Sequence, residues 1–301
     1  MSESEPAEGV SEETEAPNKK KIYRTIICGV FSKHHRAGID RFTFKREELF
    51  EVAQESGVSL GKTEKVIAKN IGDIIYTYRF RQPFPQEILD TAPEGKMWVI
   101  LGKGIAVYEF RLITDPCLAP DKSLPITKVH DATPEIVKRF NLSDEQAILA
   151  RVRYNRLIDM FAKCVAYSLQ NHLRTTIKEI GQFEVDELYV GSNRQGEHFI
   201  IPVQFKRLND KLGVSQLFQD LELCRLKYPE YSAKAIGAQS LKRHFEGKLR
   251  DVLVMFELSC HVSSNDVTIT KICERHFLLL PSNEITGPDF EAGKKWKDDC
   301  L

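Results

Sequence analysis

Four polar side chains occur in the sequence as two pairs with the same two-residue spacing: Glu184 and Asp186, then Gln204 and Lys206. On a β-strand this spacing places both members of a pair on one face. Two carboxylates, an amide oxygen and an ammonium group can hold a hard divalent cation such as Mg²⁺ beside a phosphate. The four residues therefore predict a centre for phosphodiester hydrolysis, in which a metal ion activates water and offsets charge on the phosphate.

Each residue of this centre has an expected role. Asp186 is the best metal ligand of the set, and Lys206 is the best catalytic cation. A lysine beside the metal orients or deprotonates the attacking water and offsets the charge that builds on phosphorus. The side-chain carbonyl of Gln204 and the backbone carbonyl of Val203 are uncharged candidate ligands, and Glu184 is a candidate second carboxylate. The alternative is that Glu184 and Asp186 are ordinary outward-facing residues of a strand.

The two pairs must lie on adjacent strands if they are to face one another. Residues 182–191 and 198–207 have strand composition, and the segment between them has the composition of a hairpin loop. The other expected elements of this half are a long helix at about 144–170, either continuous or with a break, a helix at 214–228, and strands at 233–239, 252–258 and 269–280. We therefore expect an α/β fold with a central sheet flanked by helices.

The combination of Asp186 with Gln204-x-Lys206 on consecutive expected strands resembles the motif of the PD-(D/E)XK nucleases. The glutamine is similar to that of the Mrr-like restriction endonucleases, and the resemblance covers about residues 144–260. It implies a restriction-endonuclease-like mixed sheet flanked by helices, Mg²⁺ as cofactor with Mn²⁺ as a substitute, and double-stranded DNA as substrate. It also implies that Gln216, on the helix after the second strand, occupies a polar position near the phosphate backbone.

The second acidic ligand is left open by the sequence. The nuclease family often carries an acidic residue on the helix before the strands, and this chain offers only Asp159 there. Glu184 is the other candidate because it shares a strand face with Asp186, and a centre with neither is the third choice. We also expect a homodimer, because double-strand cleavage by single-site nucleases usually needs two active sites. A restriction-type function further implies a cognate methyltransferase as partner.

The sequence before the nuclease-like part predicts a separate α+β domain at residues 19–112. The expected elements are a strand at 21–30, a polar loop at 32–36, helices at 46–55 (capped by Thr43) and 63–75 (capped by Thr63), and a hairpin at 97–110. Lys103 lies between two glycines at the hairpin tip. Helix, helix and hairpin in this order indicate a winged-helix-like DNA-binding domain, whose second helix enters the major groove and whose hairpin touches phosphate.

Basic and amide side chains of this domain are candidate DNA contacts. From Lys19 to Arg111 the chain has 17 Lys plus Arg and 11 Asp plus Glu, a surplus of 6. Lys65 and Lys69 are like charges four residues apart, which slightly destabilise an isolated helix and so favour a binding role over a solvated helix face. The candidates are Lys62, Lys65, Lys69, Asn70, Arg79, Arg81 and Lys103, followed further along the chain by His172 and Arg174, for which a capping role is the alternative.

The bulk composition limits the remaining choices. The chain has 301 residues, of which 42% are hydrophobic and 29% are charged, and its net charge is zero. Seven scattered cysteines without a Cys-x-x-Cys pair favour reduced thiols over a zinc site. No apolar run reaches the roughly 18 residues of a membrane span, so we expect no membrane association and a cytoplasmic location.

The expected domain plan has a disordered acidic tail at 1–18, the winged-helix-like domain at 19–112, a linker at 113–142, the nuclease domain at 143–281 and a polar tail at 282–301. The tail at 1–18 carries six Glu and no Lys or Arg, and it has few large apolar groups. The preferred function is a metal-dependent DNA endonuclease of restriction or DNA-defence type. The alternatives are a non-catalytic DNA-binding regulator with a degenerate nuclease fold, and a repair or recombination nuclease for branched DNA.

Overall fold

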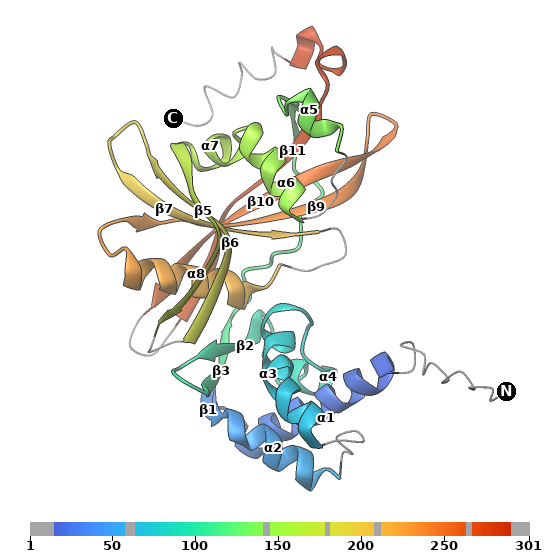
Figure 1. Ribbon diagram of the computed structural model, residues 1–301, viewed down its shortest axis with the longest axis vertical. Coiled ribbons are helices and arrows are strands. Elements are labelled where there is room, and N and C mark those ends of the chain that lie inside the picture. The colour runs from blue at the N-terminus through green and yellow to red at the C-terminus, as the bar shows by residue number, and fades with distance from the viewer. Residues whose placement is uncertain are drawn as a thin grey trace, which may run out of the picture.

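Two β-sheets organise the chain (Figure 1). The computed structural model describes residues 15–57, 64–140, 145–177, 181–207, 212–262 and 267–289. A three-stranded sheet belongs to the N-terminal part, and an eight-stranded sheet belongs to the rest of the chain. The protein therefore has a mixed α/β architecture with a large sheet flanked by helices. None of the described helices is long and apolar enough to span a membrane.

The N-terminal part consists of α1 (Glu15–His34), β1 (Arg41–Lys45), α2 (Arg46–Glu55), α3 (Glu64–Phe80), α4 (Gln86–Leu89), β2 (Lys96–Gly102) and β3 (Val107–Thr114). Strand β3 lies between β1 and β2 and pairs antiparallel with both. The helices pack around a buried aromatic cluster that includes Phe44, Trp98 and Phe110. The expected helix at 46–55 and the expected hairpin at 97–110 are both present.

Helix α1 replaces the strand expected at 21–30 and extends into the loop expected at 32–36. Its buried side chains recur at helical spacing: Tyr23, Ile26, Ile27, Val30 and Phe31. This stripe covers the core of the N-terminal part, and its burial outweighs the strand preference of the Ile and Val residues. Thr43 is also not a helix cap, since it lies within β1. The cap position of α2 is Lys45, whose backbone N–H donates to the Glu48 carboxylate at 2.7 Å. The expected cap Thr63 lies outside the described residues.

The large sheet has the strand order β4-β11-β10-β9-β7-β6-β5, with β8 beside β7. Its strands are β4 (Ile126–His130), β5 (Val165–Ile177), β6 (Gly181–Ser192), β7 (His198–Lys206), β8 (Ser232–Ala233), β9 (Ala235–Phe245), β10 (Lys248–Val262) and β11 (Val267–Leu280). The helical elements of this part are α5 (Glu135–Lys138), α6 (Glu145–Tyr154), α7 (Leu157–Ala162), α8 (Val214–Lys227) and the short 3₁₀ helix Ser282–Glu284. Strands β5, β6 and β7 form an antiparallel meander, and β7 pairs parallel with β9.

A continuous helix over 144–170 is not present, because two short helices and the start of a strand occupy this range. Helix α6 ends at Tyr154, and α7 is flanked by Arg156 and Lys163, which both adopt the left-handed conformation with φ of 53°. Strand β5 begins at Val165, so the last part of the expected helix is extended. The break is fixed by the buried Asn155, whose amide donates to Thr133 Oγ1 at 3.0 Å and accepts from the Ala132 N–H at 2.7 Å.

The segment expected as a linker at 113–142 contributes to the large sheet, because β4 pairs parallel with β11 at the sheet edge. The expected polar tail also contacts this edge as far as it is described. Asp289 forms an ion pair with Lys128 of β4 at 3.0 Å, and Glu284 forms one with Arg250 of β10. Both segments therefore belong to the folded unit.

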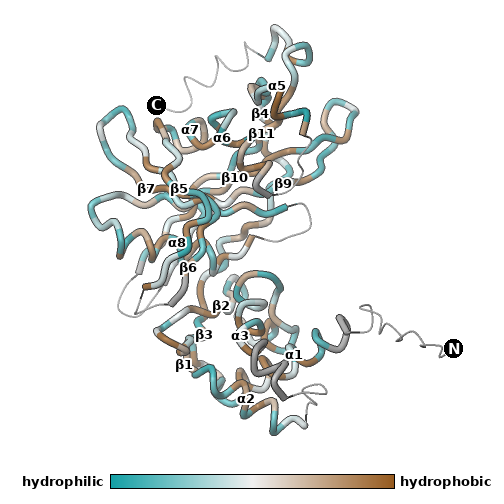
Figure 2. The backbone as a smooth tube through the Cα atoms, in the orientation of Figure 1, coloured by the Kyte–Doolittle hydropathy of each residue, from teal (hydrophilic) through white to brown (hydrophobic). Residues whose placement is uncertain are grey.

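Helices cover both faces of the large sheet (Figure 1). On one face, α6 and α7 pack through residues such as Val152 and Phe161. On the other face, Leu217 of α8 shares a buried cluster with Val99 of β2, so α8 lies between the two sheets. Figure 2 shows apolar residues concentrated along the strands of the large sheet and polar residues in the loops at its rim.

Candidate functional site

Strands β6 and β7 separate at one end, and polar side chains fill the opening. Their ladder ends at the pair Glu187–Val203. Beyond this pair, the Asp186 carboxylate accepts a hydrogen bond of 2.8 Å from the Phe205 backbone N–H. The Gln204 amide donates a hydrogen bond of 2.9 Å to the backbone carbonyl of Glu184. Side chains thus replace backbone pairing where the hairpin opens, which fixes Asp186 and Gln204 next to each other.

Helix α8 closes this opening from one face of the sheet. The Gln216 amide donates to Gln204 Oε1 at 2.6 Å. Asp220 lies one turn further along α8, so it shares the helix face of Gln216. Its side chain is 1% exposed, and its Oδ2 has no hydrogen-bond partner within the described residues. The opening therefore contains a second carboxyl group that comes from α8.

Both carboxyl groups are held in an environment that favours the protonated form. Burial raises the pKa of Asp186 above its ordinary value, against the opposing effects of the Phe205 N–H and the Lys206 and His172 charges. Complete burial raises the pKa of Asp220 well above its ordinary value, and the nearby Asp186 charge adds to the rise. A cation at this point would relieve both effects, because desolvated carboxylates are stabilised by a close positive charge.

Lys206 supplies a positive charge at the same point. Lys206 follows Gln204 by two residues on β7, so both side chains lie on the same face of the strand, and its charge lowers the pKa of both Asp186 and Asp220. No ion pair within 4.0 Å joins its ammonium to a carboxylate of the described residues. Lys206 is partly buried at the end of β7. The ammonium group is therefore close to the two acids without being neutralised by either.

The Glu184 carboxylate is paired with an arginine, whereas its expected role was that of a metal ligand. It lies opposite Arg174 of β5, and the Arg174 guanidinium donates to Glu184 Oε1 at 2.9 Å and 3.2 Å. Its negative charge still contributes to the raised pKa of Asp186. His172, also on β5, is exposed and its charge acts on Asp186 as well. Charges of His172 on β5 and of Glu184 on β6 thus act on Asp186, and Arg174 of β5 pairs with Glu184.

Asp159 is not part of this site. It lies on α7, on the opposite face of the sheet, and its Oδ1 accepts hydrogen bonds from Arg156 at 2.5 Å and from the Ala166 N–H at 2.9 Å. Val203 lies within the sheet, paired with Glu187 on one side and Ile236 on the other, and its side chain is fully buried.

The oxygen donors at the opening fit a hard cation that takes only a few of its ligands from the protein. Asp186 and Asp220 offer carboxyl groups, Gln204 offers an amide oxygen, and Asp220 Oδ2 is buried without a partner. Mg²⁺ is commonly held by one or two carboxylates, with water and substrate phosphate as the other ligands. Within the described ranges, no group of three or more His, Cys, Asp or Glu side chains is placed to hold a metal ion. Two carboxyl groups and an amide oxygen would leave the other ligand positions of a cation to water and phosphate.

The candidate DNA contacts of the N-terminal part have different environments. Lys62 lies outside the described residues, and Lys65, Lys69 and Asn70 lie on α3 without a described side-chain environment. Arg81 follows α3 and packs over the Tyr76 ring at 4.6 Å. Lys103 lies in the loop between β2 and β3, 3.7 Å from the Glu109 carboxylate.

The Arg79 guanidinium is buried, whereas a residue that contacts phosphate must be accessible from solvent. Its guanidinium packs over the rings of Phe80 and Tyr108, at 4.9 Å and 5.8 Å. Its Nε and Nη2 are shielded from solvent and lack a hydrogen-bond partner among the described residues. Burial accordingly lowers the pKa of Arg79 to about 10. Arg81 and Lys103 are therefore the more accessible members of the set.

Asp220 is not among the site residues expected from the sequence. An acidic residue on a helix usually indicates a solvated face, so the residue type alone gives no signal. Its spacing of four residues from Gln216 was the available signal, because residues at i and i+4 share a helix face.

Comparison of the chain with protein-family models, with curated proteins and with solved structures returned no match.

Proposed function

We propose that this chain is a Mg²⁺-dependent DNA endonuclease whose centre is the opening between β6 and β7. The observation that carries the proposal is the convergence of Asp186, Asp220 and Lys206 around the fixed amide of Gln204. The motif-bearing strands are consecutive, and the helix that follows them brings Gln216 to the same point. This arrangement supports the resemblance to the PD-(D/E)XK nucleases of the Mrr-like type.

Each residue of the proposed centre would have a separate role in hydrolysis. A bound Mg²⁺ would supply charge relief on the phosphate and an activated water. Asp186 would hold the ion, with Asp220 as the second carboxylate in place of Glu184 or Asp159. Lys206 would orient the water and stabilise charge on phosphorus, since it is close to both acids and paired with neither.

The remaining members of the centre hold or approach the substrate. Gln216 donates to Gln204 Oε1, which fixes the orientation of the Gln204 amide. His172 and Arg174 lie at the β5 edge beside Asp186, where the backbone of bound DNA would pass. Glu184 keeps Arg174 in place through their ion pair.

The N-terminal part supports a role in DNA docking. Its order of helix, strand, three helices (the last of them the four-residue α4) and hairpin, with β3 between β1 and β2, supports a winged-helix-like domain. Arg81 and Lys103 are basic residues at the end of α3 and at the hairpin tip. Double-stranded DNA is the proposed substrate, a homodimer the proposed cleaving unit, and a restriction system with a cognate methyltransferase the proposed setting.

The test is Mg²⁺-dependent cleavage of plasmid DNA by the full chain, repeated with Mn²⁺ and with methylated and unmethylated DNA. Asp186→Asn and Lys206→Ala should each lose cleavage while retaining DNA binding. Asp251→Asn and Lys242→Ala are matched controls, because these two residues form an exposed ion pair on the β9–β10 hairpin. Cleavage by Lys206→Ala at the wild-type rate would rule out the proposed centre.

The environment of Asp220 favours one alternative, a DNA-binding regulator that does not cleave. Burial stabilises the protonated carboxyl, and Gln204 is uncharged, so a weaker metal site would result than in a centre with two exposed acids. The same cleavage assay separates the two functions. A wild-type chain that binds DNA and nicks none of the substrates with either metal would be the regulator.

A further inference from the structure

A second polar pocket lies on the opposite face of the large sheet from Asp186. It has a volume of about 210 Å³ and is formed between the α6–α7 elbow and strands β5 and β6. Consecutive strand residues point to opposite faces, so Glu187 faces this pocket region while Asp186 faces α8. The Arg153 Nε donates to Glu187 Oε1 at 2.8 Å, which confirms the direction of Glu187. The pocket is therefore separate from the proposed nuclease centre.

The pocket is held in shape by buried contacts. Arg156 adopts the left-handed conformation at the elbow, and the neighbouring Asn155 fixes that turn through its buried hydrogen bonds. At one end, Glu187 Oε1 accepts hydrogen bonds from both Arg153 and Ser168, at 2.8 Å and 2.7 Å. Glu187 itself is fully buried. The walls are thus fixed by the fold and do not need a ligand to form.

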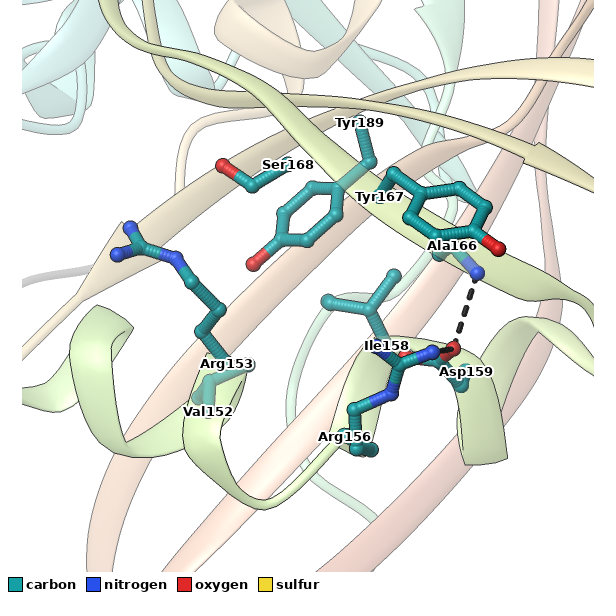
Figure 3. A pocket seen from close by; sticks show the side chains of 9 residues that line it. All are labelled: Val152, Arg153, Arg156, Ile158, Asp159, Ala166, Tyr167, Ser168 and Tyr189. Carbon is teal, nitrogen blue, oxygen red and sulfur yellow. Dashed lines mark hydrogen bonds and ion pairs between the residues drawn. The ribbon is translucent and has the colours of Figure 1, made fainter. Parts of the chain in front are cut away.

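The charges that line the pocket are balanced. Arg153 pairs with Glu187 at one end, and Arg156 pairs with Asp159 at the other, at 2.5 Å. Figure 3 shows the two guanidinium groups at opposite sides of the cavity. An inorganic phosphate would meet a carboxylate wherever it met a guanidinium. The balance therefore favours a neutral ligand with hydrogen-bonding groups along its edges over an anion.

Hydrogen-bonding groups remain available in this pocket. The side chains of Arg153 and Arg156 are 37% and 55% exposed, so each guanidinium keeps N–H groups for a ligand. The Tyr189 hydroxyl is buried at the inner end of the pocket, close to the Glu187 carboxylate and the Arg153 guanidinium. This hydroxyl and the Arg153 guanidinium are therefore placed to meet the polar edge of a ligand that reaches this end.

Aromatic and apolar surfaces complete the pocket. The rings of Tyr189 and Tyr167 line it from the strand side, and Val152 and Ile158 line it from the helix side. In Figure 3 both rings lie above the elbow that carries Arg156. Tyr167 lies on the edge strand β5 and is 61% exposed, so its ring is accessible for stacking. A flat ligand with polar edges fits such a slot.

We propose that this pocket binds a single nucleobase, either from a free nucleotide or from a base turned out of a DNA strand. A nucleobase is neutral and flat, its edges carry donors and acceptors, and proteins bind such bases by stacking on aromatic rings with hydrogen bonds to the edge. The assignment is independent of the nuclease proposal, because its residues lie on the other face of the sheet. The exposed Tyr167 ring provides the stacking surface, and Arg153, Arg156 and Tyr189 meet the edges of the base.

The experiment titrates the full chain with the four deoxynucleosides, observed by ligand NMR, and with a DNA duplex that carries one 2-aminopurine. At least one deoxynucleoside should bind saturably, and Tyr167→Ala should weaken this binding by about tenfold or more, as loss of a stacking ring does. Tyr189→Phe should weaken it as well. Tyr154→Ala is the matched control, because Tyr154 is an exposed tyrosine of α6 outside the pocket.

Two further comparisons identify the source of the base. A rise in 2-aminopurine fluorescence that Tyr167→Ala removes would assign the pocket to a base turned out of DNA, whereas nucleoside binding without that rise would assign it to a free nucleotide. Asp186→Asn should keep either response, so loss of cleavage and loss of base binding are distinguishable. The proposal is overturned if neither probe responds, or if Tyr167→Ala and Tyr154→Ala respond equally.

Discussion

The Gln216 side chain donates a hydrogen bond of 2.6 Å to Gln204 Oε1, and this contact joins helix α8 to strand β7. The same Gln204 donates through Nε2 to the carbonyl of Glu184. The two bonds fix which way the amide points, so its oxygen is directed to α8 and its nitrogen to β6. An amide oxygen has two lone pairs, so Gln204 can accept from Gln216 and still approach a cation.

Gln204→Glu should make the protein less stable without metal and more responsive to Mg²⁺. The new carboxylate loses the donor to Glu184 and lies beside two buried acids, which should cost about 1–3 kcal/mol of the free energy of unfolding in a chelator. Bound Mg²⁺ would offset this loss, because a ligand that binds only the native state raises stability. Thermal unfolding with and without Mg²⁺ measures both effects. Gln170→Glu, on the exposed face of β5, is the control, and an equal Mg²⁺ response in both variants would contradict the prediction.

Asp220→Asn should stabilise the metal-free protein, and the gain should grow with pH. The native carboxyl has a pKa well above the ordinary 3.8 because it is buried. Between those two values the native state holds more protons than the unfolded state, so wild-type stability falls as pH rises. Below pH 3.8 both states are protonated and the gain should vanish. Urea unfolding in a chelator across this pH range tests the prediction, and a gain independent of pH would contradict it.

Asp289→Asn provides a contrast of opposite sign. The Thr286 backbone N–H and the Lys128 ammonium lower the pKa of Asp289 to about 2. This carboxylate therefore contributes stability above the unfolded pKa, and the contribution is lost as pH falls towards the native value. The variant should be less stable than the wild type at neutral pH, with the difference shrinking in acid. The same unfolding series measures it.

Asn155→Ala should destabilise the protein through the α6–α7 elbow. The buried Asn155 side chain makes hydrogen bonds to Thr133, Asp131, the Ala132 N–H and the Arg151 carbonyl. Loss of these bonds should cost about 2–4 kcal/mol. Asn171→Ala is the matched control, since Asn171 is exposed and only accepts bonds of 3.1 Å from Arg153 and 3.5 Å from Ser168. Equal destabilisation of the two variants in urea unfolding would show that the elbow is not held in this way.

Arg81→Ala and Lys103→Ala should weaken DNA binding in a salt-dependent manner. Each lost phosphate contact should reduce the slope of log affinity against log salt by about 0.9 in magnitude. Titrations of a short duplex at several salt concentrations give the slope. Lys242→Ala, on the β9–β10 hairpin, should leave it unchanged. An unchanged slope in both Arg81→Ala and Lys103→Ala would place the DNA elsewhere on the protein.

The strand pair β6–β7 and helix α8 could be predicted from the sequence, because each carries its own pattern. Alternating side chains define the strands, and the loop between them has hairpin composition. A break in the helix expected at 144–170 was one of two alternatives, but its position between α6 and α7 could not be predicted in this way. Arg156 and Lys163 adopt left-handed conformations without being glycine, and the buried partner of Asn155 lies more than twenty residues earlier in the chain. A local pattern contains no trace of such a contact.

Only part of the candidate site could be predicted, because a local pattern contains no information on contacts between distant segments. Asp186, Gln204 and Lys206 share a local strand pattern, whereas Asp220 enters the site only through the packing of α8. The strand expected at 21–30 was wrong for a different reason, because these residues belong to helix α1. Its Ile and Val residues favour a strand locally, but the spacing of Tyr23, Ile26 and Ile27 matches a helix that covers the N-terminal core.

The cluster that Val99, Leu101 and Ile113 share with Leu217 and Phe218 limits how the chain can be divided. A cut near residue 142 would leave apolar side chains of both halves in contact with water, and surfaces of this kind promote self-association. The N-terminal part and the part built on the large sheet are therefore not interchangeable modules. Replacing the first with a domain from another protein would require a new apolar face on α8, the same helix that carries Gln216 and Asp220.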